Sequence, residues 1–406
     1  MPGISSGGFG RRWVFSTQYN NSTGADFDQG MGSNWMATSV PTLAGSAWSA
    51  ADISFRTQSG AMRYMKQTGT GTFSSMFGDR SILSHNATTH EYTYVESDGT
   101  KTIFNDLTHT TAPGQMTSQV APGGQTTTLT GTIGASLDAQ RINTTGGVTR
   151  FESFLQNYYA SGSSVGKLQS VLLRRGDAGQ PWENIERLTL TYYDGTTSYG
   201  SLNDLKSSTK EIWDGSAWVA PKVTYYRYYI AGVNTDIGFV HGLRYVVNPA
   251  AWEKMVSDSI DPLTAADSVI AQYADRYFQY DPYTRRVNYW ATNGGTQSFQ
   301  LSYSYNSHSV GTPAPFGSWV QKSSLTLQDG SKQVFYSNYY GMVILSVLIG
   351  AGGVRKWSSF TRYDSAGRTI WQANPSAVSG YDEQYDDLLN YNSSTSKYQY
   401  LKDSDG

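Results

Sequence analysis

Short runs rich in Tyr, Thr, Val and Phe, many with alternating apolar and polar positions, recur along the whole chain. Each run meets the alternation or the propensity criterion for a β-strand. The clearest runs cover residues 91–96, 187–193, 223–230, 298–305 and 332–340. Asp-Gly and other glycine-containing pairs separate the runs, and such pairs tolerate the positive φ angles of antiparallel hairpin turns. The pattern therefore predicts an all-β chain built from antiparallel hairpins.

Two segments have helical rather than alternating spacing. Asn248 followed by Pro249 is typical of a helix start, and the apolar residues that follow share one face. A second helix is expected to open at Thr264, with Asp267 three residues later as its capping partner. Together these signals predict one helical insert, over residues 248–277, in an otherwise β chain.

Other stretches predict loops and one buried strand. Residues 68–75, 110–132 and 376–380 are rich in Ser, Thr and Gly and are expected to be loops. The apolar run from Met342 to Val354 is shorter than the roughly 20 residues of a membrane span. It predicts a buried strand, and we expect no membrane span. The first residues lack the basic and apolar stretches of a secretory signal.

Composition narrows the class of protein. Among 406 residues, 30 Lys and Arg stand against 32 Asp and Glu, so the net charge is −2 and we expect no nucleic-acid partner. Aromatic residues make up 14% of the chain and charged residues 15%, below the roughly 25% charge of ordinary soluble domains. The absence of Cys excludes disulfides, thiolate nucleophiles and Cys-bound metals. This composition favours a large aromatic β core over disorder or long helices.

The dipeptide Tyr-Asp recurs at residues 193–194, 280–281 and 363–364. The copies are 87 (280 − 193) and 83 (363 − 280) residues apart, which suggests blocks of several strands. We expect the Tyr to lie across the neighbouring strand and the Asp to cap the amides of a turn.

The best-formed copy covers residues 360–370. There a strand ends at Arg362 and Tyr363, Asp364 opens the turn, Gly367 supplies a left-handed residue, and Arg368 opens the return strand. The copy at Tyr280 and Asp281 is looser because Pro282 sets the turn and the Gly is lost.

These residues resemble the rearrangement-hotspot (Rhs), or YD-repeat, family, whose units read Tyr-Asp, a short turn, Gly-Arg and a hydrophobic return strand. The resemblance extends to residues 9–13, 32–36 and 97–104 near the start and to residues 242–287, 329–332, 336–343 and 375–382 further on. It is specific over 355–382, moderate over 223–345 and weak before residue 150.

The family resemblance implies a β-sheet shell that often encloses a toxic C-terminal domain or presents an adhesive surface. We therefore expect an all-β fold, an elongated twisted antiparallel sheet of YD/Rhs-type repeats that forms a partial β-shell with a small helical insert. The expected regions are an Rhs-like N-terminal β region (1–150), YD-like repeats (151–247), the helical insert (248–277) and further YD/Rhs repeats (278–406).

The same resemblance implies a function and its partners. We expect a non-catalytic scaffold of a larger secreted or cell-surface protein, located outside the cell or in the cell envelope. Its partners would be downstream repeats and a C-terminal toxin or adhesive domain of the same polypeptide. The chain looks like the front portion of such a protein, because it stops at Gly406 in mid-repeat without an effector domain. The alternatives are a carbohydrate-binding adhesive module that takes cell-surface glycans and, third, a glycoside-active enzyme.

The sequence offers little catalytic chemistry, so we expect no enzymatic activity, catalytic residue, cofactor or metal. His85 and His90 are five residues apart, which does not fit the i, i+4 spacing of a zinc-hydrolase helix. The carboxylates Asp382, Glu383, Asp386 and Asp387 cluster in one segment, whereas a glycosidase pair must flank the scissile bond from two sides. Residues 403–405 mimic the start of a calcium loop but end before its remaining ligands.

Aromatic residues supply the remaining candidate ligand site. Trp213 and Trp218 flank a tight turn, and Tyr226 and Tyr228 follow on the next strand. Such rings can stack on sugar faces. Core and cross-strand packing explains them as well and is the interpretation we favour.

Overall fold

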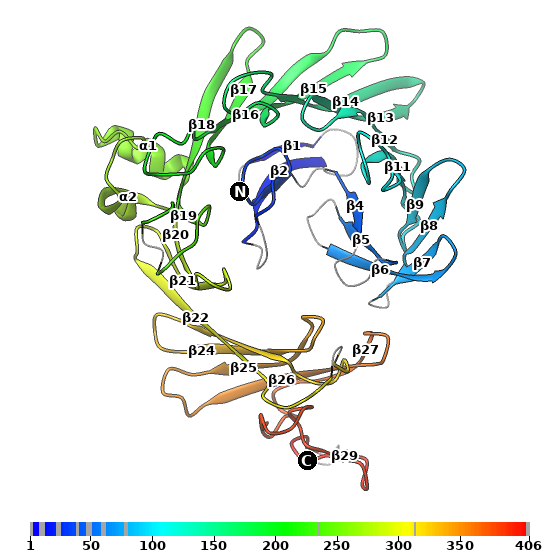
Figure 1. The fold of residues 1–406 in the computed structure, drawn as a ribbon, viewed down its shortest axis with the longest axis vertical. Coiled ribbons are helices and arrows are strands. Elements are labelled where there is room, and N and C mark those ends of the chain that lie inside the picture. The colour runs from blue at the N-terminus through cyan, green and yellow to red at the C-terminus, as the bar shows by residue number, and fades with distance from the viewer. Residues whose placement is uncertain are drawn as a thin grey trace. The chain divides into compact units, whose positions relative to one another are not determined.

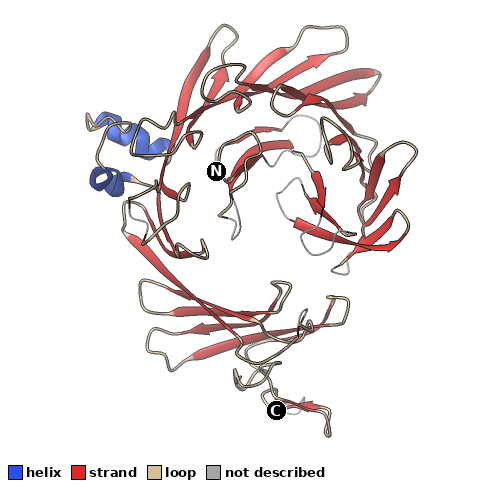
Figure 2. Cartoon of the chain, viewed as in Figure 1, coloured by secondary structure: helices blue, strands red, loops and turns tan. Residues whose placement is uncertain are grey.

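The computed structural model describes residues 3–7, 13–21, 26–37, 40–45, 51–57, 62–76, 80–233, 236–311 and 314–402. It divides into two compact units, Met1–Arg286 and Val287–Gly406. Both units consist of antiparallel strands, and two short helices interrupt the first (Figure 2). The predicted all-β class with one small helical insert is confirmed.

The large sheet of the first unit is a meander in which successive strands pair antiparallel (Figure 1). Its strands are β4 (Thr42–Gly45), β5 (Ile53–Arg56), β6 (Met62–Gly69), β7 (Thr72–Ser75), β8 (Ile82–Asn86), β9 (Glu91–Val95), β10 (Lys101–Asn105), β11 (Met116–Val120), β12 (Thr126–Thr132), β13 (Ser136–Thr145), β14 (Val148–Tyr158), β15 (Leu168–Asp177), β16 (Glu183–Tyr192), β17 (Leu205–Trp213), β18 (Trp218–Tyr228), β19 (Leu243–Val247) and β20 (Arg276–Tyr280).

Strand β4 is hydrogen-bonded to two parts of the large sheet, β5 and the residues just before β11. Besides pairing with β5, it is bridged at Thr42 to Gln115, and the amide of Leu43 donates to the carbonyl of Gly114 at 2.9 Å. A Cβ on Gly114 would lie 2.0 Å from the Leu43 carbonyl oxygen, and the residue has a φ of 65°. Only glycine fits this close backbone approach.

A small sheet from the N-terminal segment covers one face of the large sheet. It contains β1 (Gly3–Ser6), β2 (Trp13–Tyr19) and β3 (Trp35–Ala37), and β1 and β2 lie within the curve of the larger sheet (Figure 1). Ile4, Trp13, Phe15 and Trp35 are buried there in one cluster with apolar residues of β13–β19. The core of this unit is therefore closed by residues far away in the sequence.

The helical insert lies between β19 and β20. Helix α1 (Pro249–Ser257) begins as predicted, because the Asn248 side chain accepts a hydrogen bond from the amide of Ala251 and Pro249 follows. Helix α2 (Asp267–Tyr273) begins three residues later than the predicted start at Thr264. The Thr264 hydroxyl instead donates to Asp261 at 3.0 Å, which fixes a turn ahead of the helix.

The second unit is also built from antiparallel strands that pair in chain order, and it has its own core. Its strands are β21 (Val287–Thr292), β22 (Gln297–Tyr305), β23 (Gln321–Thr326), β24 (Lys332–Ser337), β25 (Val343–Ile349), β26 (Lys356–Tyr363) and β27 (Thr369–Ala373). The segment after β27 covers the core with Val378, Leu388 and Leu389, and it ends in the hairpin of β28 (Tyr391–Asn392) and β29 (Lys397–Tyr398). The apolar run after Met342 forms β25, but the strand ends at Ile349 and is buried only in part, with Val343 and Leu348 exposed.

Two loop predictions are wrong. Residues 68–75 contain the end of β6 and the whole of β7, which pair with each other in a tight hairpin. Residues 110–132 contain β11 and β12, which pair with each other and with their neighbours. Threonine is β-branched, so it suits a strand as well as a loop, and composition alone could not distinguish the two.

Candidate functional site

The three Tyr-Asp copies use their tyrosines in the same way. Each hydroxyl donates to a backbone carbonyl: Tyr193 to Tyr226 at 2.7 Å, Tyr280 to Leu243 at 2.8 Å and Tyr363 to Val343 at 2.9 Å. In each pair the carbonyl belongs to a different strand or strand end from the tyrosine. The ring therefore crosses the sheet, and its one polar atom is satisfied by the backbone.

The aspartates of the three copies cap the following turns. Asp364 accepts from the amides of Ala366 and Arg368, both at 2.9 Å, and its other oxygen pairs with the Arg368 side chain. Asp281 accepts from the amide of Thr284 at 2.7 Å, and Asp194 accepts from the amide of Thr196 at 2.9 Å.

These bonds also explain the acidity of the capping carboxylates. Hydrogen bonds from the Thr196 hydroxyl and the Thr284 amide lower the pKa of Asp194 and Asp281, respectively. The backbone amide of Arg368 does the same for the pKa of Asp364. The carboxylates are held ionised by the turns that they cap.

Trp213 and Trp218 face each other across the β17–β18 hairpin. Their ring centroids are 5.1 Å apart, and the turn between them is capped by Asp214, which accepts from the amides of Ser216 and Ala217 at 2.8 Å. Both rings are half-buried. The Arg187 guanidinium lies 4.6 Å from the Trp218 ring, so part of that indole is covered by a cation.

Tyr226 and Tyr228, the other two candidates for stacking on a ligand, lie in the core. They are 1% and 2% exposed. The Tyr228 hydroxyl donates to the carbonyl of Leu205 at 2.7 Å and accepts from the Trp35 indole at 2.8 Å. Burial raises the pKa of both phenols. A ligand cannot reach either ring in this fold, which restricts the stacking hypothesis to Trp213 and Trp218.

The clustered carboxylates of residues 382–387 are committed to separate neighbours. Glu383 accepts from Lys322 at 2.6 Å and from the Tyr336 hydroxyl at 2.8 Å. Asp387 caps a turn by accepting from the amide of Asn390 at 2.8 Å, and Asp386 contacts His308 at 3.2 Å. In the described part of the chain, these hydrogen bonds do not bring two of the carboxylates together on one shared partner.

His85 and His90, which the spacing excluded as zinc-hydrolase ligands, both contact Asp106. The distances from this carboxylate are 3.4 Å to His85 Nε2 and 3.0 Å to His90 Nδ1. Among the residues that the structure describes, no cluster of three or more His, Asp or Glu side chains has the arrangement of a metal site. Residues 403–405 lie outside the described residues.

A polar cluster that the sequence did not predict joins the N-terminal sheet to the large sheet, with Asp204 fully buried and Asp26 exposed. His241 Nδ1 lies 2.8 Å from Asp204 Oδ1, and the Tyr19 hydroxyl donates to the His241 carbonyl at 2.9 Å. Arg285 pairs with Asp26 at 2.6 Å. Burial raises the pKa of Asp204, and the hydrogen bond to the Asp204 carboxylate raises the pKa of His241. Residues so distant in sequence give no local signal of this contact.

A second feature without a sequence signal is a cavity beside Arg56, at the end of β5. Strand β5 is buried along its whole length, including Arg56 at its last position. The sequence does not show that this arginine is buried, so it gives no reason to single the residue out.

Comparisons with known proteins do not assign a family. No protein-family model and no curated protein match the sequence. The crystal structure of TcdB2-TccC3-TEV aligns with a TM-score of 0.24 and 11% identity, over 96% of this chain and 19% of that chain. For TcdB2-TccC3-Cdc42 the TM-score is 0.20 and the identity 12%, over 78% and 18%.

A porin-like protein from Bacteroides uniformis aligns with a TM-score of 0.20 and 8% identity, over 82% of this chain and 93% of that chain. This chain thus spans about a fifth of the length of the TcdB2-TccC3 chains, at 19% and 18%. TM-scores this low do not place the chain in a family. In the described ranges, no helix combines the length and the hydropathy that crossing a bilayer requires.

Proposed function

We propose that this chain is a non-catalytic β-scaffold within a larger Rhs-type protein, where it encloses or presents another domain of the same polypeptide. The observation that carries the proposal is the shared use of the three Tyr-Asp copies. In each copy the tyrosine hydroxyl is bonded to a carbonyl and the aspartate caps a turn. The motif thus serves the sheet and leaves neither side chain for a substrate.

Further support comes from the other polar groups of the sheets. Tyr159, Tyr192 and Tyr229 also donate their hydroxyls to backbone carbonyls, at 2.7–2.9 Å. Repeated use of aromatic residues to link strands suits a rigid wall. In such a role the protein would work outside the cell or in the cell envelope, with downstream repeats and a C-terminal toxin or adhesive domain as its partners.

Reading the gene beyond the codon for Gly406 tests the proposal. A frame that continues through further Tyr-Asp and Gly-Arg repeats into an unrelated terminal domain would support it. A stop codon directly after Gly406 would contradict the enclosing role.

The second candidate function is a carbohydrate-binding adhesive module, which the half-buried Trp213–Trp218 pair favours. A glycan array tests it with the wild type and with Trp213→Ala and Trp218→Ala. The matched control is Trp182→Ala, because Trp182 is also half-buried and lies 4.3 Å from an arginine, Arg174. Saturable binding that is lost in the first two variants and kept in the control would favour this function over the purely structural one.

A further inference from the structure

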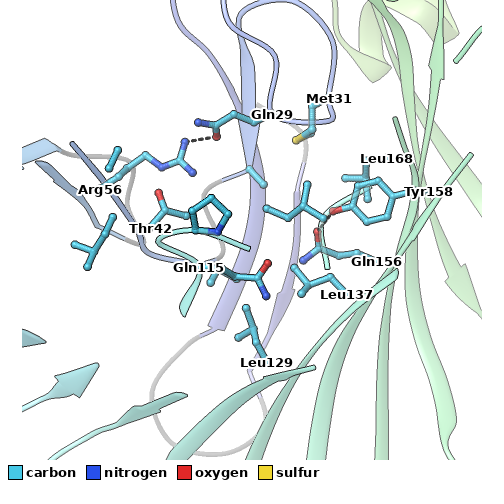
Figure 3. A pocket seen from close by; sticks show the side chains of 16 residues that line it. Gln29, Met31, Thr42, Arg56, Gln115, Leu129, Leu137, Gln156, Tyr158 and Leu168 are labelled. Carbon is cyan, nitrogen blue, oxygen red and sulfur yellow. Dashed lines mark hydrogen bonds between the residues drawn. The ribbon is translucent and has the colours of Figure 1, made fainter. Parts of the chain in front are cut away.

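A cavity of about 270 Å³ lies in the first unit, between the residues around β3 and β4 and the strands β12–β14 (Figure 3). Its volume is close to the lower end of the range for small-molecule sites, roughly 300–1,000 Å³. Leu129, Leu137, Leu168 and Met31 form apolar parts of its wall. The cavity therefore suits the apolar part of a small molecule better than a hydrated ion.

One positive charge borders this apolar space. Arg56 is 8% exposed, and its Nη1 donates to Gln29 Oε1 and lies 3.4 Å from the sulfur of Met36. No carboxylate lies within ion-pair distance of Arg56 in the described ranges of the chain. Burial lowers the pKa of the guanidinium because it penalises the charged form.

The other strongly buried arginines of this unit show how unusual Arg56 is. Arg141 is 3.7 Å from Glu152, and Arg227 is 2.7 Å from Asp267. A buried charge without a counterion is costly, and removing the partner of such a pair is strongly destabilising. Arg56 differs from both in having no carboxylate partner among the described residues.

Two further polar groups lie along the cavity wall from Arg56. The Tyr158 hydroxyl donates to Gln156 Oε1 at 3.2 Å, and Gln156 is 3% exposed. Figure 3 shows these two side chains together beside Leu137 and Leu168, with Arg56 and Gln29 across the cavity from them. Thr42 and Gln115 also line the cavity, so polar groups lie at several points of a wall that is otherwise apolar.

We propose that this cavity binds a small amphipathic monocarboxylate, with the carboxylate on the Arg56 guanidinium and the apolar body against the leucines. A guanidinium offers a planar pair of donors that matches a carboxylate, and the bond is strengthened in an apolar setting. The apolar wall would bury the hydrocarbon part and disfavour a bare inorganic anion.

Calorimetric titration of the full chain with decanoate tests the proposal, with decan-1-ol as the neutral analogue and inorganic phosphate as the bare anion. Decanoate is expected to bind, and Arg56→Met is expected to weaken it by about ten- to hundred-fold, as for the loss of a hydrogen bond to a charged group. Decan-1-ol should bind the wild type about ten-fold or more weakly than decanoate and should not discriminate the variant. Arg276→Gln removes an exposed charge, with a side chain 59% exposed, and should leave decanoate binding unchanged.

Three results would overturn the proposal. They are no decanoate binding up to about 1 mM, equal binding of decanoate to the wild type and to Arg56→Met, or phosphate binding as tight as that of decanoate. Leu129→Trp fills the cavity without changing charge and should abolish binding.

Melting temperatures of the wild type and of Arg56→Met provide a second test, which applies even if Leu129→Trp does not fold. Ligand-free Arg56→Met should melt no lower than the wild type, because an unpaired buried charge is removed. Decanoate should raise the melting temperature of the wild type only. A lower melting temperature of the ligand-free variant would mean that Arg56 serves the fold, which would contradict the proposal.

Discussion

The two units complete their sheets with different side chains. In the first unit the contact with the N-terminal sheet includes buried charged and polar groups, among them Glu152 and Asp204, both at 0% exposure. In the second unit the segment after β27 covers the core with apolar side chains, and the buried polar residues of its described part are uncharged: Ser331, Asn338 and Ser358.

The difference shows how the segment that covers the core is held in place in each unit: the N-terminal sheet in the first and the residues after β27 in the second. Glu152 bonds Ser6 of β1 and pairs with Arg175 at 3.1 Å, so one carboxylate connects the N-terminal strand to β14 and β15. Directional bonds of this kind specify one position of the segment. In the second unit Glu383 bonds Lys322 and Tyr336 from an exposed position, whereas the buried contacts of the segment after β27 are apolar and lack that directionality. We therefore expect the first unit to be sensitive to loss of charge and the second to loss of volume.

The largest effect is expected from Glu152→Gln. The change leaves Arg141 and Arg175 without their carboxylate, and breaking a buried pair costs about 3–5 kcal/mol. Urea unfolding followed by hydrogen exchange of peptides from each unit would locate the loss in the first unit. Glu183→Gln, on the exposed start of β16, should change stability by less than about 0.5 kcal/mol. Equal losses in the two variants would contradict the role of the buried charge.

Leu389→Ala should destabilise the second unit by about 2–4 kcal/mol, because Leu389 is 0% exposed and its loss leaves a cavity. The same exchange measurement would show the loss in peptides of β24–β26. Leu348→Ala is the control, since Leu348 on β25 is 43% exposed. If the control were as damaging, apolar burial would not explain how this unit is held.

Gly367→Val should cost about 1–3 kcal/mol through strain at its φ of 76°. A Cβ there would also lie 2.8 Å from the Phe316 ring, whereas Gly353, with a φ of 74°, has no atom within 4 Å of that position. Backbone strain is common to Gly367→Val and Gly353→Val, whereas the clash with Phe316 occurs only in Gly367→Val. In thermal unfolding, Gly367→Val should therefore be the less stable variant. Unchanged stability of Gly367→Val would mean that the turn assignment is wrong.

Phenylalanine substitutions compare the Tyr-Asp copies of the two units. Tyr280→Phe should cost about 0.5–1.5 kcal/mol, because it leaves the Leu243 carbonyl without its donor in a buried site. Tyr363→Phe should cost less, since Tyr363 is half-buried and water can replace the hydroxyl. Tyr283→Phe, 92% exposed, serves as the control in urea unfolding. A reversed order would contradict the structural role of the hydroxyl.

The smallest effect concerns pH and the first unit. The folded pKa values of Asp204 and His241 are both raised, so the stability that each contributes is present below its unfolded pKa and is lost as pH rises through the folded one. The unfolding midpoint of the first unit should fall as pH rises from about 6 to about 9, through the His range. His241→Gln should flatten this fall. A midpoint that rose over the same range would contradict the sign.

Local patterns predicted much of the fold. Asn248 and Pro249 located the start of α1, and the apolar run after Met342 located β25. The turn around Asp364 and Gly367 has the capping bonds and the left-handed glycine that its sequence predicts. Each of these features depends on interactions within a few residues.

The long-range contacts could not be predicted in this way. Ser6 meets Glu152 across 146 positions, and Tyr19 meets His241 across 222. The sequence favours core packing for Tyr226 and Tyr228, but their own strand gives no sign that Trp35 of the N-terminal sheet is what covers them. The environment of Arg56 likewise depends on Gln29 and Met36, which precede it on other segments.

The central claim is that the N-terminal sheet of β1–β3 is an integral part of the first unit. Native-state hydrogen exchange of its strands tests this claim. The amides of Phe15 and Thr17 in β2 should exchange with the same free energy of opening as that of Phe154 in β14, because their side chains share one core or lie buried beside it. Exchange of the β2 amides at the rate of an unstructured peptide, with β14 still protected, would contradict the account.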